Sequence, residues 1–403
     1  MKIFDANLKI ILDSRGNETL SADLRGLNAD QRGQASVPSG KSRGTHEAFV
    51  LEPKLALEKF EEIKPQILGH EFETQKEFDN FLISLDGTSN KQNFGANLIL
   101  ALSLAFARLK AKNENLELFK YINNISQIKI EKFILPKPIF NVINGGSHAT
   151  HPQSKLSFQE FQVIPLVDDL GLGMSIVKEF YRKLGDYLVE KYGKGNVLLG
   201  DEAGYSAPFQ SNEEVLDILW DFINEHNYPL RIGLDLAASQ FYGKERLAYF
   251  VDGKEYSAEE LKKYYLELID RYQLISLEDS FEEEDFDSFT KLKEETKDIL
   301  IIADDLTTTN PERLKIAIEK KAGDTILIKP NQIGTITETL NVIRMAYENG
   351  WQVVVSHRSG ETMDSFISDL AVGVGAWGLK AGAPGAPERL VKYERILAIR
   401  EKI

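Results

Sequence analysis

The sequence of 403 residues contains no cysteine, which excludes disulfides, zinc–thiolate centres and thiol nucleophiles. Long apolar runs are missing too. The stretch LILALSLAFA at 98–107 falls well short of the ~18 residues that a membrane span needs. The first residues lack the apolar segment and small-residue cleavage site of a secretion signal. These absences predict a cytoplasmic protein that does not enter a membrane.

Positive charge is scarce relative to negative charge. Asp and Glu together number 62 against 48 Lys and Arg, for a net charge of −14. A nucleic-acid footprint needs clustered Lys and Arg, so the balance argues against direct nucleic-acid binding. It does not exclude a small anionic substrate, because local charges and metals govern such a site.

Complete nucleotide-binding loops are also missing. ASVPSGKS at 35–42 ends like a P-loop, but Ala35 stands where that motif requires glycine. GLGMSI at 171–176 lacks the third glycine of a dinucleotide loop, and no G-x-S-x-G nucleophile elbow occurs. Residue types alone leave a Ser-His-Asp site open, but no motif supports nucleotide binding.

The chain divides into two parts by its hydrophobic pattern. Residues 1–125 contain three strand-like runs, LKIILDS, ETLSADLRG and RGQASVP, followed by helical patterns at 55–67, 74–84 and 94–111. Strands followed by helices predict a small N-terminal α+β domain. Over 133–403, short apolar runs alternate with helical patterns, which is typical of covered parallel strands. The overall class is α/β, with a C-terminal (β/α)₈-type barrel; the alternative is a doubly wound open sheet.

Seven apolar runs of the second part each end on ionisable residues. If these runs are barrel strands, their ends meet at one mouth, where barrel active sites lie. The runs are 197–200, 231–236, 274–279, 299–305, 325–329, 351–359 and 374–382. Their terminal groups are Asp201-Glu202, Asp235, Glu278-Asp279, Asp304-Asp305, Lys329, His357-Arg358-Ser359 and Lys380.

The order of these groups separates acids from bases. Asp235, Glu278 and Asp304 offer only oxygen ligands, which favours Mg²⁺, Mn²⁺ or Ca²⁺ over zinc. Lys329, Arg358 and Lys380 suit phosphate or carboxylate groups, so the pocket is predicted to bind a small, multiply anionic substrate. A single acid at a strand end is more often a helix N-cap, and a single cation a salt-bridge partner. Capping does not explain the cations, because a helix N-terminus repels them.

Several motifs together resemble the enolase family, in that family's order along the chain. They are SVPSGKSRGTHEA, NVINGGSHA, QEFQVIP, GDEAGY, LDLAASQFY, LEDSFEEEDF, ADDLTTTNP, ILIKPNQIGT, VVSHRSGETMDS and KAGAP…KYERIL. The resemblance implies a barrel whose second strand is antiparallel, and reversible dehydration of 2-phosphoglycerate to phosphoenolpyruvate. It also implies two Mg²⁺ ions, the second arriving with substrate, and a homodimer or a higher oligomer of dimers.

The resemblance also implies residue roles. Lys329 corresponds to the base that takes the C2 proton, and Glu202 to the acid that protonates the departing C3 hydroxyl. The base has to be neutral, which nearby cations favour, and the acid protonated, which Glu160 or Asp201 would favour. The metal ligands are Asp235, Glu278 and Asp304, with Ser39 for the second ion. Arg358 and Ser359 correspond to phosphate contacts and Lys380 to a carboxylate contact. An outer shell consists of His148 and Gln159, which bind substrate, and Glu160 and His357, which are expected to be catalytic.

Some positions depart from the family pattern. Ala203 replaces a usual glycine beside the proposed acid, and Ala386 replaces a usual arginine. Leu236, Gln240 and Ala381 also differ, GNETL lacks the common proline, and the stretch after HEAFVLE is short. These differences are expected to affect rate, loop closure and oligomer contacts rather than reaction type.

Two other functions remain open at this point. One is an enolase-superfamily enzyme acting on another acid sugar or hydroxy acid. The phosphate-specific match of Arg358 and Ser359 weighs against it. The other is a non-catalytic scaffold or surface-binding protein, which would not need to keep the acids and bases. The chain ends Lys402-Ile403, without the terminal lysine often invoked for surface binding.

Overall fold

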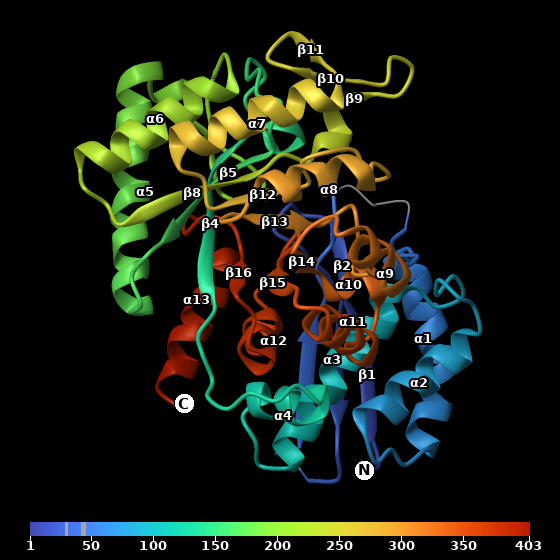
Figure 1. The fold of residues 1–403 in the computed structure, drawn as a ribbon. Coiled ribbons are helices and arrows are strands. Elements are labelled where there is room, and N and C mark those ends of the chain that lie inside the picture. The colour runs from blue at the N-terminus through green and yellow to red at the C-terminus, as the bar shows by residue number, and fades with distance from the viewer. Residues whose placement is uncertain (29–30, 42–45) are drawn as a thin grey trace.

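A computed structural model describes residues 1–28, 31–41 and 46–403, so residues 42–45 of the SVPSGKSRGTHEA motif lie outside the described residues. The N-terminal part has the predicted order, with an antiparallel sheet followed by helices (Figure 1). Its elements are β1 (Asp5–Leu12), β2 (Glu18–Arg25), β3 (Arg32–Ser36), α1 (Pro53–Gly69), α2 (Gln75–Asp86), α3 (Ala96–Asn113) and α4 (Leu118–Ser126).

Helix α3 contains the apolar run at 98–107. The run is buried because α3 packs against β2 and β3 on one side and against α2 and α4 on others. Among the described residues, no helix is both long and apolar enough to cross a membrane.

Eight strands of the second part close into a barrel, which confirms the predicted fold class and excludes the open sheet. Closure comes from the pairing of β16 with β4, and β5 is antiparallel to both its neighbours, as the resemblance implied. The strands are β4 (Lys137–Asn144), β5 (Glu160–Pro165), β8 (Leu230–Asp235), β12 (Ser276–Glu278), β13 (Leu300–Ala303), β14 (Thr325–Ile328), β15 (Gln352–Ser356) and β16 (Gly378–Lys380). The helices are α5 (Leu170–Tyr192), α6 (Asn212–Glu225), α7 (Ala258–Tyr272), α8 (Phe286–Glu295), α9 (Pro311–Lys320), α10 (Pro330–Ile333), α11 (Ile336–Glu348), α12 (Phe366–Val374) and α13 (Pro387–Arg400).

The prediction of a barrel strand at 197–200 is wrong. Only Leu198 and Leu199 form a strand there, β6; both are partly exposed, and β6 pairs with β7 (Tyr205–Ser206) beside β4. The first two barrel strands, β4 and β5, were not predicted because Asn141 and Gln162 interrupt their hydrophobic patterns. A second small sheet, of β9 (Tyr242–Gly243), β10 (Ala248–Val251) and β11 (Lys254–Tyr256), was not predicted.

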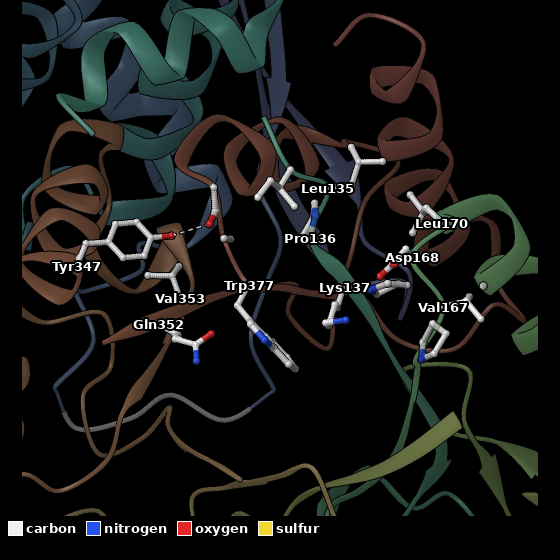
Figure 2. A pocket seen from close by; sticks show the side chains of 16 residues that line it. Leu135, Pro136, Lys137, Val167, Asp168, Leu170, Tyr347, Gln352, Val353 and Trp377 are labelled. Atoms are coloured by element: carbon white, nitrogen blue, oxygen red, sulfur yellow. Dashed lines mark hydrogen bonds between the residues drawn. The ribbon is translucent and has the colours of Figure 1, made fainter. Parts of the chain in front are cut away.

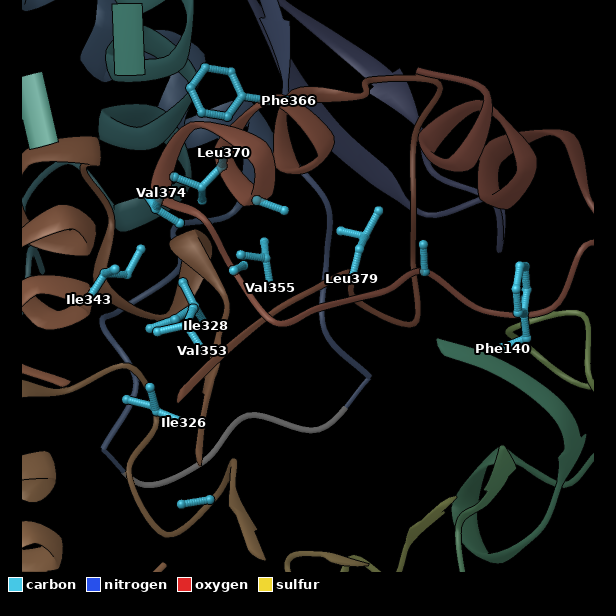
Figure 3. Packing of buried hydrophobic residues seen from close by; sticks show 14 of the residues in the cluster. Phe140, Ile326, Ile328, Ile343, Val353, Val355, Phe366, Leu370, Val374 and Leu379 are labelled. Carbon is cyan, nitrogen blue, oxygen red and sulfur yellow. The ribbon is translucent and has the colours of Figure 1, made fainter. Parts of the chain in front are cut away.

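Alternation along the strands creates two cores. Ile326, Ile328 and Val355 face outward and pack under the helices, together with side chains such as Ile343 and Leu370 (Figure 3). The barrel interior is a separate cluster, formed by Ile139, Ile164, Ile302, Leu327 and Val354. Because side chains alternate with a period of two, the residues two positions beyond these interior side chains, such as Lys329 after Leu327, continue along the barrel axis towards its mouth.

Other residues cap the helices that follow the barrel strands. Asp285 caps α8, Asn310 caps α9 and Thr335 caps α11, each through its own side chain. The strand-end acids Glu278 and Asp304 therefore do not cap these helices. Helix capping, which was the simpler interpretation of these two acids, is therefore excluded.

The N-terminal part is joined to the barrel by ion pairs and hydrogen bonds near the mouth. Arg108 of α3 binds both carboxylate oxygens of Asp364, at 2.5 and 2.7 Å. Asp79 of α2 accepts hydrogen bonds from the backbone N–H and hydroxyl of Thr337, at 2.9 and 2.6 Å. The backbone N–H groups of Ser36 and Lys41 donate to Asp364 and Ser359, which links these two residues to the segment that follows β15.

Candidate active site

A small polar cavity of about 40 Å³ lies at the mouth of the barrel, where the parallel strands end. Eleven of the thirteen predicted site residues line it: His148, Gln159, Glu160, Glu202, Asp235, Asp304, Lys329, His357, Arg358, Ser359 and Lys380. Seven further lining residues had no predicted site role, although two of them, Asp279 and Asp305, were identified at strand ends: Lys41, Glu47, Ala237, Gln240, Asp279, Asp305 and Ser356. The tertiary structure therefore brings together groups that are up to 339 residues apart in sequence, from Lys41 to Lys380.

Lys380 lies among the acids from three strands. Its Nζ is 2.9 Å from Asp235 Oδ2, 2.8 Å from Glu278 Oε1 and 3.0 Å from Glu160 Oε2. Burial lowers the pKa of Lys380, but these carboxylates outweigh it and raise the pKa well above its usual value. Burial also raises the pKa of Glu278, and the neighbouring Asp235 raises it further. Glu278, which does not line the cavity, is thus connected to the site through Lys380.

Lys329 is paired with Asp304 through a short contact from Nζ to Oδ2. The backbone of Asp304 and Asp305 is held by Asp279, whose carboxylate accepts both N–H groups at 2.9 and 2.8 Å. Burial lowers the pKa of Lys329, but Asp304 outweighs it, so the pKa is raised. We expected the opposite direction from the sequence, because the pairing with Asp304 was not visible there.

Glu202 is buried between two histidines and an amide. Its Oε2 accepts a hydrogen bond from Asn141 at 3.0 Å and lies 3.3 Å from His357 Nε2, while Oε1 lies 3.7 Å from His148 Nδ1. Burial raises the pKa of Glu202, but His357 and His148 hold it well below its usual value. Burial and the charge of Glu202 instead raise the pKa of Glu160. These pKa directions are the reverse of those that an acid role of Glu202 needs.

The N-terminal part supplies two further groups. Glu47 binds Arg358 with both oxygens, at 3.0 and 3.1 Å from Nη1 and Nη2. Lys41 donates its backbone N–H to Ser359 Oγ at 2.9 Å, and its Nζ lies 2.9 Å from Asp201 Oδ2. Both residues lie in the SVPSGKSRGTHEA motif, which was the sequence signal that could have found them.

Ser39 lies outside the cavity lining. Its hydroxyl donates to Asp13 Oδ2 through a short hydrogen bond and accepts from Arg15 Nη2 at 2.9 Å, and its backbone pairs with Gly360. A Cβ at Gly360 would come within 2.5 Å of Ser39 Oγ, so this close approach requires glycine. The structure does not bring Ser39 to the three predicted metal-binding acids.

Among residues 1–28, 31–41 and 46–403, two groups of three acidic or histidine side chains have ligand atoms within 4.8 Å of one another. His148, Glu160 and Glu202 form one, and Asp279, Asp304 and Asp305 form the other. Both carboxylate oxygens of Asp279 already accept backbone N–H groups, and Asp304 is paired with Lys329, so a metal ion in the second group would compete with these partners.

The opposite end of the barrel contains a larger cavity of about 550 Å³ (Figure 2). Trp377, Val353 and Leu135 are among its mainly apolar lining, and Tyr347 donates to the carbonyl of Gly375 at 3.1 Å. Lys137 and Asp168 are its only ionisable lining residues besides that tyrosine. This cavity is much larger than the polar one, but the acids and bases lie at the other end.

Comparison with known proteins agrees with the polar site. The model of the enolase C-terminal TIM barrel domain matches residues 132–403, and that of the enolase N-terminal domain matches residues 3–122. The enolase of Methanococcus aeolicus is 41% identical, covering 100% of this chain and 95% of the relative. The enolase of Methanocaldococcus jannaschii is 40% identical with 100% and 96% coverage, and that of Pyrococcus furiosus 40% identical with 98% and 93%. The chain therefore belongs to the enolase family of phosphopyruvate hydratases, lyases that interconvert 2-phosphoglycerate and phosphoenolpyruvate.

Proposed function

We propose that the polar cavity performs this reaction with Lys329 as the base and Glu202 as the acid. The observation that carries the proposal is that the buried Glu202 and the half-buried Lys329 line one small cavity, together with several acids and the cations Arg358 and Lys380. A substrate with a phosphate and a carboxylate needs such a mixture of charges.

The donor set fits Mg²⁺. Asp235, Glu278 and Asp304 end the neighbouring strands β8, β12 and β13, are all buried, and offer only oxygen. Lys380 and Lys329 now contact these acids, which shows that the acids need positive charge beside them. When bound, Mg²⁺ would supply the positive charge that stabilises the substrate carboxylate as its α-proton leaves.

We further propose two ions, the second arriving with substrate. Ser39 can serve the second ion only if its hydroxyl leaves Asp13 and Arg15. The loop that carries Ser39 would therefore shift relative to Asp13 when substrate binds.

In the dehydration direction, the neutral amine of Lys329 takes the C2 proton. The electron pair of that C–H bond first moves into the carboxylate, which gives an enolate, and then forms the C2–C3 double bond as the C3–O bond breaks. Glu202 gives its proton to the departing hydroxyl, which leaves as water. Both roles need the reverse of the present pKa directions, so bound substrate and Mg²⁺ would have to draw Asp304 away from Lys329 and change the charges beside Glu202. Arg358 and Ser359 hold the phosphate, so Arg358 exchanges its Glu47 partner for substrate, and Lys380 holds the carboxylate. Gln159, His148, Glu160 and His357 surround these groups.

An ultraviolet assay tests the proposal. The pure protein with 2-phosphoglycerate and Mg²⁺ should produce rising absorbance as the conjugated double bond of phosphoenolpyruvate forms. Lys329→Ala should abolish turnover while calorimetry still detects Mg²⁺ binding. A folded, metal-loaded wild-type protein without absorbance change would refute the proposal, and loss of Mg²⁺ binding in the variant would indicate a structural lysine.

We also propose the domain limits 1–125 and 133–403, and a cytoplasmic location without direct nucleic-acid or membrane partners.

We further propose a homodimer or a higher oligomer of dimers. Support for association comes from β1, which is an edge strand. Its Leu12 is 64% exposed and, together with Met363, which is 60% exposed, lines a cavity of about 580 Å³. Light scattering after gel filtration would measure the oligomer, and a monomer at micromolar concentration would contradict this proposal.

A further inference from the structure

Arg389 in the first turn of α13 has a completely buried side chain that no assigned role explains. It is the largest fully buried side chain among the described residues. Among the described residues, Glu388 is the only one with a carboxylate within 4.0 Å of the Arg389 guanidinium, and its Oε1 lies 3.9 Å from Nε. Because a buried guanidinium is costly unless it is paired, its partners should reveal why it is there.

The guanidinium binds three backbone carbonyls and one ring nitrogen. Nη1 donates to Arg358 O at 2.8 Å, and Nη2 donates to Asp201 O at 2.9 Å and Ser359 O at 2.6 Å. Nη1 also makes a short contact with His357 Nδ1. One side chain thus joins the segment before Glu202 to the segment that contains His357, Arg358 and Ser359.

The contact with His357 determines where that ring holds its proton. A guanidinium only donates hydrogen bonds, so Nδ1 of His357 must accept, and the proton of the neutral ring lies on Nε2. Nε2 is 3.3 Å from Glu202 Oε2. The other tautomer would place an N–H at Nδ1 against the N–H of the guanidinium, and a lone pair at Nε2 against the carboxylate.

The backbone at Gly382 packs closely against the stem of Arg389. A Cβ at Gly382 would come 2.9 Å from Arg389 Cδ and 2.8 Å from Glu202 O. Ala383 N donates to the same carbonyl of Glu202 at 2.9 Å. Arg389, residues 382–383 and the backbone of Glu202 therefore form one packed unit.

We propose that Arg389 is a positioning residue of the reaction, which holds His357 with Nε2–H towards Glu202 and keeps the 201 and 357–359 segments at one spacing. This inference rests on the proposed role of Glu202 as the acid. It predicts that Arg389 matters for loss of the C3 hydroxyl and not for removal of the C2 proton, because Lys329 has no contact with this unit among the described interactions.

Isotope exchange separates the two steps. In D₂O with Mg²⁺ and 2-phosphoglycerate, Lys329 takes the C2 proton, exchanges with solvent and returns a deuteron, which NMR detects without any dehydration. Arg389→Lys and Arg389→Met should reduce dehydration ~100-fold while exchange changes less than about threefold. The matched control is Arg395→Met on the same helix, whose guanidinium pairs with Asp369 at 2.6 Å, outside the cavity. That control should leave both rates unchanged.

Equal losses of exchange and dehydration in a folded Arg389 variant, or no loss of either, would overturn the proposal. Absence of both reactions in the wild-type protein would instead refute the proposed function. Selective ¹⁵N labelling of the six histidines provides a test that needs no stable Arg389 variant. His357 should show a protonated Nε2 and an unprotonated Nδ1, and a protonated Nδ1 would overturn the proposal by itself.

Discussion

Glu47 of the N-terminal part and Arg358 of the barrel form a buried, two-pronged ion pair, with N–O distances of 3.0 and 3.1 Å. The proposed phosphate-binding group is therefore already paired with an anion. Breaking the pair leaves a buried charge, so Glu47→Gln should lower the free energy of unfolding by ~3 kcal/mol. Thermal unfolding would measure this, with the exposed Glu61→Gln of α1 as the matched control.

Inorganic phosphate gives the same variant a second readout. Because phosphate can replace the lost carboxylate beside Arg358, it should raise the melting temperature of Glu47→Gln more than that of the wild-type protein. An equal rise in both proteins would contradict the role of Arg358 in holding phosphate.

The position of Lys380 predicts how the protein responds to metal removal. In Lys380→Met, Glu160, Asp235 and Glu278 lose the ammonium that contacts all three. The variant should be less stable in chelator, by ~3 kcal/mol, and Mg²⁺ should raise its melting temperature more than it does for the wild-type protein. Calorimetric scans with and without Mg²⁺ would measure this difference. If Mg²⁺ stabilised both proteins equally, the acids around Lys380 would not be the metal site.

Ala203, beside the proposed acid, has a left-handed backbone with φ of 62°. A Cβ is disfavoured there, so Ala203→Gly should raise the free energy of unfolding by about 1 kcal/mol. The matched control is Ala386→Gly, another departure from the family, whose φ of −132° needs no glycine and which should not be stabilised. Urea unfolding of both variants would measure this, and a less stable Ala203→Gly would show that local packing outweighs the backbone strain.

Asp79 should make the stability depend on pH. Burial raises its pKa from 3.8 to about 6, although Thr337, Ser103 and Gln75 donate hydrogen bonds to it. Between these pH values the folded state holds a proton that the unfolded state has lost, so stability falls as the pH rises. The loss is ~3 kcal/mol in total, at about 1.4 kcal/mol per pH unit.

Asp79→Asn should remove this dependence. Unfolding measured from pH 4 to pH 6 should show the extra decline in the wild-type protein only. An identical decline in both proteins would assign the effect to other groups.

Much of the fold followed from local pattern. The strands and first three helices of the N-terminal part were predicted because their hydrophobic periods of 2 and 3.6 are clear. The barrel strands with continuous apolar runs were found for the same reason. β4 and β5 were not predicted because the polar side chains of Asn141 and Gln162 interrupt the apolar pattern of these strands. β6 was misread because a short apolar run is not evidence of burial: Leu198 is 38% and Leu199 50% exposed.

The sequence by itself determined the chemical inventory of the site. Asp235, Glu278, Asp304, Lys329, Arg358 and Lys380 were identifiable because each ends an apolar run, and barrel strands end at one mouth. Only the tertiary structure decided the partners: Lys380 with Glu278, Lys329 with Asp304, Glu47 with Arg358 and Arg389 with His357. The physical reason is that strand order places side chains on a face, whereas pKa direction, tautomer and pairing depend on charges that are distant in sequence and a few ångströms apart in space.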